Sequence, residues 1–174
     1  MNCRSMKNKK GVVYTPWMRE HGGEYVPSDN AHGMVYRIFH RPTGRWYIGK
    51  KQVYKTAKMS KREIASLGEE YRNKDGSINR SRSLTKRVYS DWRTYKSSCD
   101  DLQKMIKTDI EIFGEIPDTW EFTVLYECTT EAQLKYFEAR AIMMHDGLLD
   151  ELCYNSNIHY RQIGMINIEG VREL

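Results

Sequence analysis

Two short runs of β-branched and aromatic residues, joined by a tight-turn sequence, constrain the fold of this chain more than any other feature. The runs lie at residues 34–39 (MVYRIF) and 46–48 (WYI), and both have the composition of β-strands. Between them, Pro42 fixes the φ needed at the first corner of a type I turn, and Gly44 can adopt the left-handed conformation that follows. We therefore predict an antiparallel β-hairpin.

A first helix is expected after this hairpin, beyond a long polar stretch. Ser98 and the two aspartates after Cys99 resemble a capping box with an acidic first turn. Apolar residues from Leu102 onward have helical spacing, and Gly114 is a typical helix stop.

A third strand and a second helix follow. Residues 120–126 (WEFTVLY) alternate as a strand does. Thr130 and Gln133 predict the capping box of a helix that runs to about His145. The order of elements predicts an α+β fold, in which helices flank a small antiparallel three-stranded sheet.

The expected organisation is one domain with two flanking segments. The domain covers residues 33–160, an arm covers 1–32, and a tail covers 161–174. Within the domain, a Lys- and Arg-rich stretch at about 50–90 has the character of an inserted loop, with a short helix beginning at Ser60.

Composition excludes several classes of protein. The 174 residues carry a formal net charge of +5, which is compatible with a nucleic acid or another anionic partner. No apolar run approaches the roughly 20 residues of a membrane span, and the N-terminus lacks the apolar core of a secretory signal. The four cysteines lack the paired spacing of a zinc site. We expect a cytoplasmic protein with reduced cysteines and no membrane association.

One carboxylate in the second predicted helix is out of place. The helix has an apolar stripe at Leu134, Phe137, Ala141 and Met144, and Glu138 lies beside it. A carboxylate there is costly unless it is paired or binds a metal ion. The residues alone leave two interpretations open: a metal ligand, or a side chain at the margin of the stripe that pairs with Lys135 or Arg140.

The amino-acid sequence of the hairpin resembles the signature of the GIY-YIG nucleases. Residues 33–36 (GMVY) and 47–49 (YIG) lie on its two arms. Glu138 and Asn155 follow in the order in which the family keeps its metal-binding glutamate and an asparagine. The resemblance covers about residues 33–157, and the inserted stretch is similar to the phage-encoded, free-standing, homing-endonuclease-like branch.

Two features depart from the family pattern. GMVY carries one residue more than the strict triplet. The family's arginine, expected on a helix after the second strand, is not fixed by the pattern, and the candidates are Arg93 and then Arg87.

The resemblance implies a metal-dependent endonuclease that hydrolyses phosphodiester bonds in double-stranded DNA. Tyr36 would be the general base toward the attacking water, Tyr47 would orient water or a phosphate oxygen, and Glu138 would bind one Mg²⁺ or Mn²⁺ ion. A tyrosine base requires a pKa depressed from about 10, and Lys50, Lys51 and an arginine can supply that field.

The basic residues in and before the inserted stretch can contact DNA phosphates without sequence preference; they are Lys50, Lys51, Lys55, Lys58, Lys61, Arg62 and Arg87. The alternative is that this stretch is a solvated loop.

Two other functions compete with the nuclease: a catalytically inactive nucleic-acid-binding protein with this fold, and a regulatory protein. One active centre per protomer would leave double-strand cutting to a dimer or to two nicks, so the sequence leaves monomer and dimer open.

Overall fold

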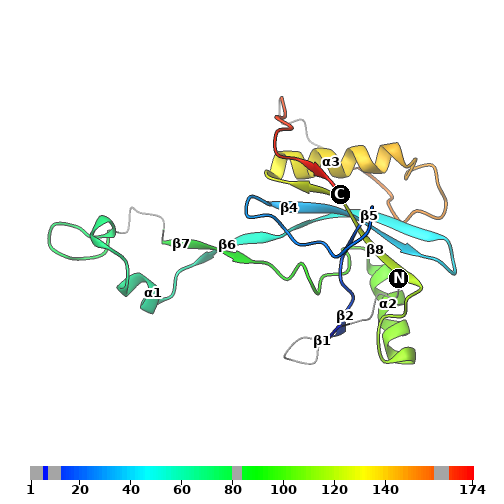
Figure 1. Ribbon diagram of the computed structural model, residues 1–174, viewed down its shortest axis with the longest axis horizontal. Coiled ribbons are helices and arrows are strands. Elements are labelled where there is room, and N and C mark those ends of the chain that lie inside the picture. Colours follow the sequence, from blue (N-terminus) through cyan, green and yellow to red (C-terminus); the bar gives the residue numbers. More distant parts are fainter. Residues whose placement is uncertain (1–5, 8–12, 80–83, 159–164) are drawn as a thin grey trace. The chain divides into compact units, whose positions relative to one another are not determined.

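The computed structural model describes residues 6–7, 13–79, 84–158 and 165–174 (Figure 1). The chain forms two compact units. The larger unit combines the residues up to Val53 with those from Asp91 onward, and the smaller unit is residues 54–90. The larger unit contains the central sheet, and the smaller unit contains a separate pair of strands.

The predicted three-stranded antiparallel sheet forms the centre of the larger unit. Strands β4 (Gly33–His40) and β5 (Arg45–Gln52) are the expected hairpin, and β8 (Trp120–Cys128) pairs with the other edge of β4. Gly44 closes the turn with φ of +68°. In this register Tyr36 lies opposite Gly49.

Two short strands extend this sheet, so among the described residues the sheet has five strands and is mixed. Strand β3 (Met18–Arg19) pairs parallel to β8, and β9 (Arg172–Glu173) pairs antiparallel to it. Both have only two residues, which is too short for an alternating pattern, so the sequence predicted only the three long strands. Strands β1 (Met6–Lys7) and β2 (Val13–Tyr14) form a separate antiparallel pair.

The second half of the expected N-terminal arm packs into the core. Trp17 is only 1% exposed, and its ring lies 4.8 Å from the ring of Tyr36 and 5.4 Å from that of Phe122. Its indole nitrogen donates to the carbonyl of Trp92 at 3.0 Å. Tyr25 and Ala31 are also buried. This segment therefore covers the face of the sheet that carries Tyr36.

A buried carboxylate holds that segment in place. Glu127 of β8 accepts hydrogen bonds from the Tyr25 hydroxyl at 2.8 Å and from the Ser28 hydroxyl at 2.7 Å, and it pairs with Arg172 of β9 at 3.2 Å. Burial first, and then the charge of Glu127, raise the pKa of Tyr25, so this hydroxyl remains a donor. The cluster joins the N-terminal segment and β9 to the central sheet.

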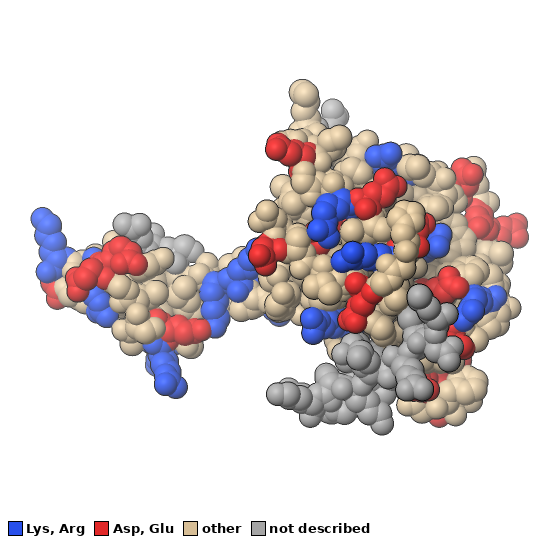
Figure 2. All heavy atoms as spheres, in the orientation of Figure 1, with Lys and Arg blue, Asp and Glu red and all other residues tan. Residues whose placement is uncertain are grey.

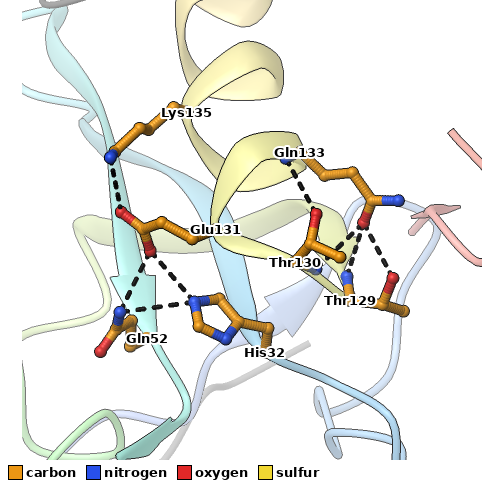
Figure 3. Close-up of polar contacts among 7 residues, drawn as sticks. All are labelled: His32, Gln52, Thr129, Thr130, Glu131, Gln133 and Lys135. Atoms are coloured by element: carbon orange, nitrogen blue, oxygen red, sulfur yellow. Dashed lines mark hydrogen bonds and ion pairs between the residues drawn. The ribbon is translucent and has the colours of Figure 1, made fainter. Parts of the chain in front are cut away.

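Helix α3 (Glu131–Met144) covers the opposite face of the sheet, against β4, β5 and β8 (Figure 1). Its predicted capping box is present, and Figure 3 shows the Gln133 side-chain oxygen accepting from the backbone nitrogens of Thr129 and Thr130. Leu134, Phe137 and Ala141 are buried as expected, but Met144 is 62% exposed. Ile142 fills the core at that end instead.

Helix α2 (Asp100–Phe113) ends as predicted but begins differently. Gly114 caps its C-terminus with φ of +76°. Its N-cap is Cys99, which makes no side-chain capping bond, so the capping box predicted around Ser98 is wrong. The Ser97 hydroxyl instead accepts from the Cys99 backbone nitrogen at 2.8 Å, which turns the chain into the helix.

The smaller unit is more ordered than the loop that its polarity suggested. Strands β6 (Tyr54–Lys58) and β7 (Thr85–Tyr89) pair antiparallel. Helix α1 (Lys61–Ala65) begins at Ser60, as predicted, and a 3₁₀ turn, η1, follows at Glu69–Tyr71. Among the described residues, no helix combines the length and the apolar character that crossing a bilayer requires.

The core role of the N-terminal segment can be measured. Trp17→Ala should lower the free energy of unfolding by about 3–5 kcal/mol, the usual cost of removing a buried tryptophan. Val26→Ala is the matched control, because Val26 lies in the same segment and is 60% exposed; it should change stability by less than about 0.5 kcal/mol. Urea denaturation of both variants measures this free energy. An equally small effect of Trp17→Ala would show that the segment is a loosely held arm and not part of the core.

Candidate functional site

The contact between Tyr36 and Gly49 organises the hairpin motif. Tyr36 is fully buried, and a Cβ atom placed on Gly49 would lie 2.6 Å from its hydroxyl oxygen and 2.7 Å from Cε1 of Tyr47. Any side chain at position 49 would displace both tyrosines. Glycine is therefore required here for space.

The first glycine of the motif is required for the same reason. A Cβ atom on Gly33 would lie 2.8 Å from the carbonyl oxygen of Lys51 and 2.6 Å from Cδ2 of Leu134. The backbone of β5 and the side chain from α3 thus both approach β4 at this point. Gly33 lets the helix and the two strands come together.

The Tyr36 hydroxyl is buried, and among the described residues nothing lies in hydrogen-bond geometry with it. Burial is the largest cause that raises its pKa well above the ordinary value, and Tyr95, Tyr47 and Glu138 act in the same direction. We expected nearby cations to depress this pKa, so the direction is the opposite of that expectation. In this state Tyr36 is a neutral hydroxyl at neutral pH.

Tyr47 is half-buried and lines a cavity. The hydroxyl oxygen lies 3.0 Å from Oγ of Ser98, a residue of the loop before α2. Burial raises the pKa of Tyr47, and the hydrogen bond with Ser98 partly opposes that shift. The sequence signal for Ser98 was its place before a helix start, which did not distinguish a cap from a site residue.

Glu138 of α3 forms an ion pair with Lys50 of β5. Its side chain is only 15% exposed, which agrees with its position beside the apolar stripe. The two partners considered from sequence lie elsewhere, since Lys135 pairs with Glu131 at 3.3 Å and the Arg140 guanidinium lies 5.6 Å from the Phe137 ring. The pair with Lys50 compensates the buried charge.

One cavity of about 380 Å³ joins these side chains. The residues that line it are Tyr47, Lys50, Ser98, Cys99, Glu138, Ile142, Tyr154, Asn155, Ser156, Asn157 and Ile158. Tyr36 is not among them. The structure thus brings Tyr47, Lys50, Glu138 and Asn155 together at one opening, with Tyr36 packed at 6.3 Å from the ring of Tyr47.

Asn155 is engaged by the backbone of β5. Its Oδ1 accepts from the nitrogen of Ile48 and its Nδ2 donates to the oxygen of Ile48, both at 2.8 Å. Two backbone bonds continue this pairing, from Trp46 N to Leu152 O at 3.1 Å and from Tyr154 N to Trp46 O at 2.9 Å. Asn155 therefore closes the outer edge of β5 and holds the residues between Tyr47 and Lys50.

The two arginine candidates do not line this cavity. Arg93 is exposed in a turn, with its guanidinium 5.2 Å from the Trp92 ring. Arg87 belongs to β7 of the smaller unit and lies 3.6 Å from the Tyr54 ring. Arg45, which the sequence did not single out, lies 5.2 Å from the ring of Tyr154 in the cavity wall.

The other basic candidates divide between the two units. Lys51 pairs with Asp91 at 2.7 Å and lies 3.9 Å from the Tyr95 ring, on the face of β5 that carries Tyr47. The remaining four are exposed side chains of the smaller unit, namely Lys55, Lys58, Lys61 and Arg62.

The donors at the cavity fit a magnesium-type ion. Mg²⁺ takes oxygen ligands, keeps several waters and often uses one or two carboxylates, and Glu138 supplies one carboxylate at the cavity. Among the described residues no group of three or more His, Cys, Asp or Glu side chains could hold a metal. Nearer the start of α3, Glu131 is instead occupied by His32 at 3.0 Å and Gln52 at 3.1 Å (Figure 3).

Comparison with known proteins adds one finding. A family model described as "Putative endonuclease segE, GIY-YIG domain" matches residues 17–162. No curated protein and no solved structure matches the chain. The matched region begins at the buried Trp17, so it includes the segment that covers Tyr36 as well as the cavity.

The space requirement at Gly49 predicts a coupling with Tyr36. Gly49→Ala should destabilise the fold by about 1–3 kcal/mol through overpacking, although an ordinary strand glycine would gain stability from this change. Tyr36→Phe removes the nearest atom and leaves no partner unsatisfied, so it should cost little alone and should reduce the cost of Gly49→Ala. A double-mutant cycle by urea denaturation measures the coupling; identical costs in both backgrounds would contradict the contact.

Proposed function

The chain belongs to the GIY-YIG endonuclease family, and from this membership and the geometry of the cavity we propose that it is a metal-dependent DNA endonuclease. The observation that carries the proposal is the meeting of Glu138, Lys50 and Tyr47 at one solvent-accessible cavity. The nearly buried carboxylate can bind a cation, the lysine a phosphate oxygen, and the tyrosine hydroxyl a water molecule. Phosphodiester hydrolysis requires all three of these bound species.

Glu138 is the residue that would hold the divalent cation, Mg²⁺ or Mn²⁺. Such an ion polarises the phosphate and stabilises the charge on the leaving oxygen. Lys50 already contacts the same carboxylate. We propose that Lys50 turns to a phosphate oxygen when DNA binds, because an ammonium group and a divalent cation compete for one carboxylate.

The two tyrosines have different parts in this proposal. Tyr47 lines the cavity with Ser98 and would orient water or a phosphate oxygen through its hydroxyl. Tyr36 carries the family's general-base role only if positive charge arrives near its oxygen, since burial holds its pKa high in the DNA-free protein. Asn155 acts by positioning, because both atoms of its amide bind the backbone of Ile48.

The distribution of charge supports DNA as the substrate. Residues 54–90 contain ten lysines and arginines against four acidic residues, whereas the rest of the chain has 18 basic and 19 acidic residues. The positive excess therefore belongs entirely to the smaller unit. Figure 2 shows Lys and Arg side chains that project from this unit into solvent. We propose that it contacts the DNA backbone, in agreement with the salt-dependent binding of such surfaces.

Glu138→Gln tests the proposed chemistry. Loss of the charged ligand should slow Mg²⁺-dependent nicking of supercoiled plasmid by about a hundredfold or more, the scale for a group that stabilises transition-state charge. Glu131→Gln is the matched control, because it makes the same change on the same helix outside the cavity, and it should cut at close to the parental rate.

Two results would count against this assignment. Parental cutting by Glu138→Gln would remove Glu138 as the ligand. A parental protein that binds duplex DNA but cuts with neither Mg²⁺ nor Mn²⁺ would favour the inactive nucleic-acid-binding protein.

The DNA-binding role of the smaller unit predicts a change in salt dependence. Replacing Lys55, Lys58, Lys61 and Arg62 by glutamine should weaken duplex binding about equally for all sequences. The slope of log affinity against log salt should fall by roughly 0.9 for each DNA phosphate that the protein no longer neutralises. Lys104→Gln with Lys107→Gln, two exposed lysines of α2, provides the control. Titrations of labelled duplex at several salt concentrations measure this slope. If the variant has the parental slope, the four side chains do not contact DNA and form a solvated surface instead.

A further inference from the structure

Three side chains of the smaller unit form a continuous stack. Tyr54 of β6 lies directly opposite Tyr89 of β7 in the strand register, and their rings stack at 4.5 Å with an interplanar angle of 26°. The Arg87 guanidinium lies 3.6 Å from the centre of the Tyr54 ring. Tyr89 stands at the end of this series and is 57% exposed.

The stack lies on one face of the strand pair. Because side chains alternate along a strand, Tyr54, Thr56 and Lys58 share a face of β6. Their register partners on β7 are Tyr89, Arg87 and Thr85. This face thus combines two aromatic rings with two cationic side chains. Its strands contain no fully buried side chain, so the rings are not there to fill a core.

We propose that this face is a binding site for an unpaired DNA base, which stacks on the exposed ring of Tyr89. The proposal rests on the proposed function, because it names the form of DNA that the smaller unit recognises. A nucleobase continues a series of planar groups, as bases do on aromatic side chains in single-strand-binding proteins. Arg87 and then Lys58 follow on the same face, both in one direction from the tyrosine pair, and can bind phosphates on that side of the base.

The charge of the unit decides in favour of nucleic acid over a protein partner. Ten basic residues against four acidic ones make a poor surface for most proteins and a good one for a polyanion. The planar stack decides in favour of a base over a duplex groove, since a paired base has both of its faces covered by its neighbours. The substrate should therefore contain a gap, a bulge or another single-stranded segment.

The test compares two DNA probes without added metal. One is a continuous duplex, and the other has the same sequence with a short single-stranded gap; both are titrated in EDTA so that no cutting occurs. The parental protein should bind the gapped probe roughly tenfold more tightly, the scale of one base–aromatic stack. Equal affinity of the parental protein for the two probes would overturn the proposal without recourse to any variant.

Two substitutions at position 89 separate the effect of the aromatic ring from the effect of side-chain size. Tyr89→Phe keeps the aromatic face and should bind both probes as the parental protein does. Tyr89→Leu keeps an apolar side chain in the strand but should lose the preference for the gapped probe, with affinity for the continuous duplex unchanged within about twofold. An equal loss on both probes, or no loss on either, would overturn the proposal.

Failure of this inference can be told from failure of the proposed function. Plasmid nicking with Mg²⁺ is measured on the same protein preparations. If the parental protein nicks DNA but shows no Tyr89-dependent preference, the stacking site is wrong and the nuclease assignment stands. If it prefers gapped DNA through Tyr89 but never cuts, the stacking site stands and the nuclease assignment is wrong.

Discussion

The whole arrangement depends on the close approach of the Tyr36 hydroxyl to the backbone of Gly49. A Cβ at position 49 would lie 2.6 Å from that oxygen, so a side chain at residue 49 would strain the hairpin in this register. The register then places Tyr47 and Lys50 on opposite faces of β5, because successive side chains alternate, and both line one cavity because β5 is an edge strand of the sheet. Lys50 meets Glu138 of α3, while Tyr47 packs with Tyr36. Asn155 fixes the same stretch from outside by binding the backbone of Ile48.

Local sequence patterns were enough to predict the elements that position this site. The hairpin, β8 and α3 with its Thr130 cap are all present, because each carries its own periodicity or capping signal. Strands β3 and β9 could not be found this way, since two residues have no pattern and form strands only against β8. In β6 and β7 the lysines and threonines suggested a loop, although two such strands can pair through their backbones. The burial of Trp17 depends on contacts with Tyr36 and Phe122, which only the folded chain creates.

Several residues that line the cavity were singled out from the sequence, but their electrostatics were not predicted correctly. The position of Glu138 beside an apolar stripe indicated a carboxylate in need of a partner, yet the partner is Lys50, far away in sequence. The lysines after the hairpin suggested a field that would lower the pKa of Tyr36, but burial outweighs it and raises that pKa. Neither arginine candidate is among the residues that line the cavity, and neither had a helix or strand signal to orient it. The basic excess of residues 54–90, by contrast, was visible in the sequence as a Lys- and Arg-rich stretch.

The smaller unit begins and ends at neighbouring positions, since Tyr54 and Tyr89 are Cα partners across its strand pair. A segment with adjoining ends can be lengthened, exchanged or removed while the chain on either side keeps its path, as at the surface sites where inserted domains are tolerated. In the proposed function, evolution can therefore alter which nucleic acids such a protein binds by replacing one stretch between Val53 and Asp91. The packing around Gly49 would remain as it was, and recognition and chemistry could diversify at separate rates.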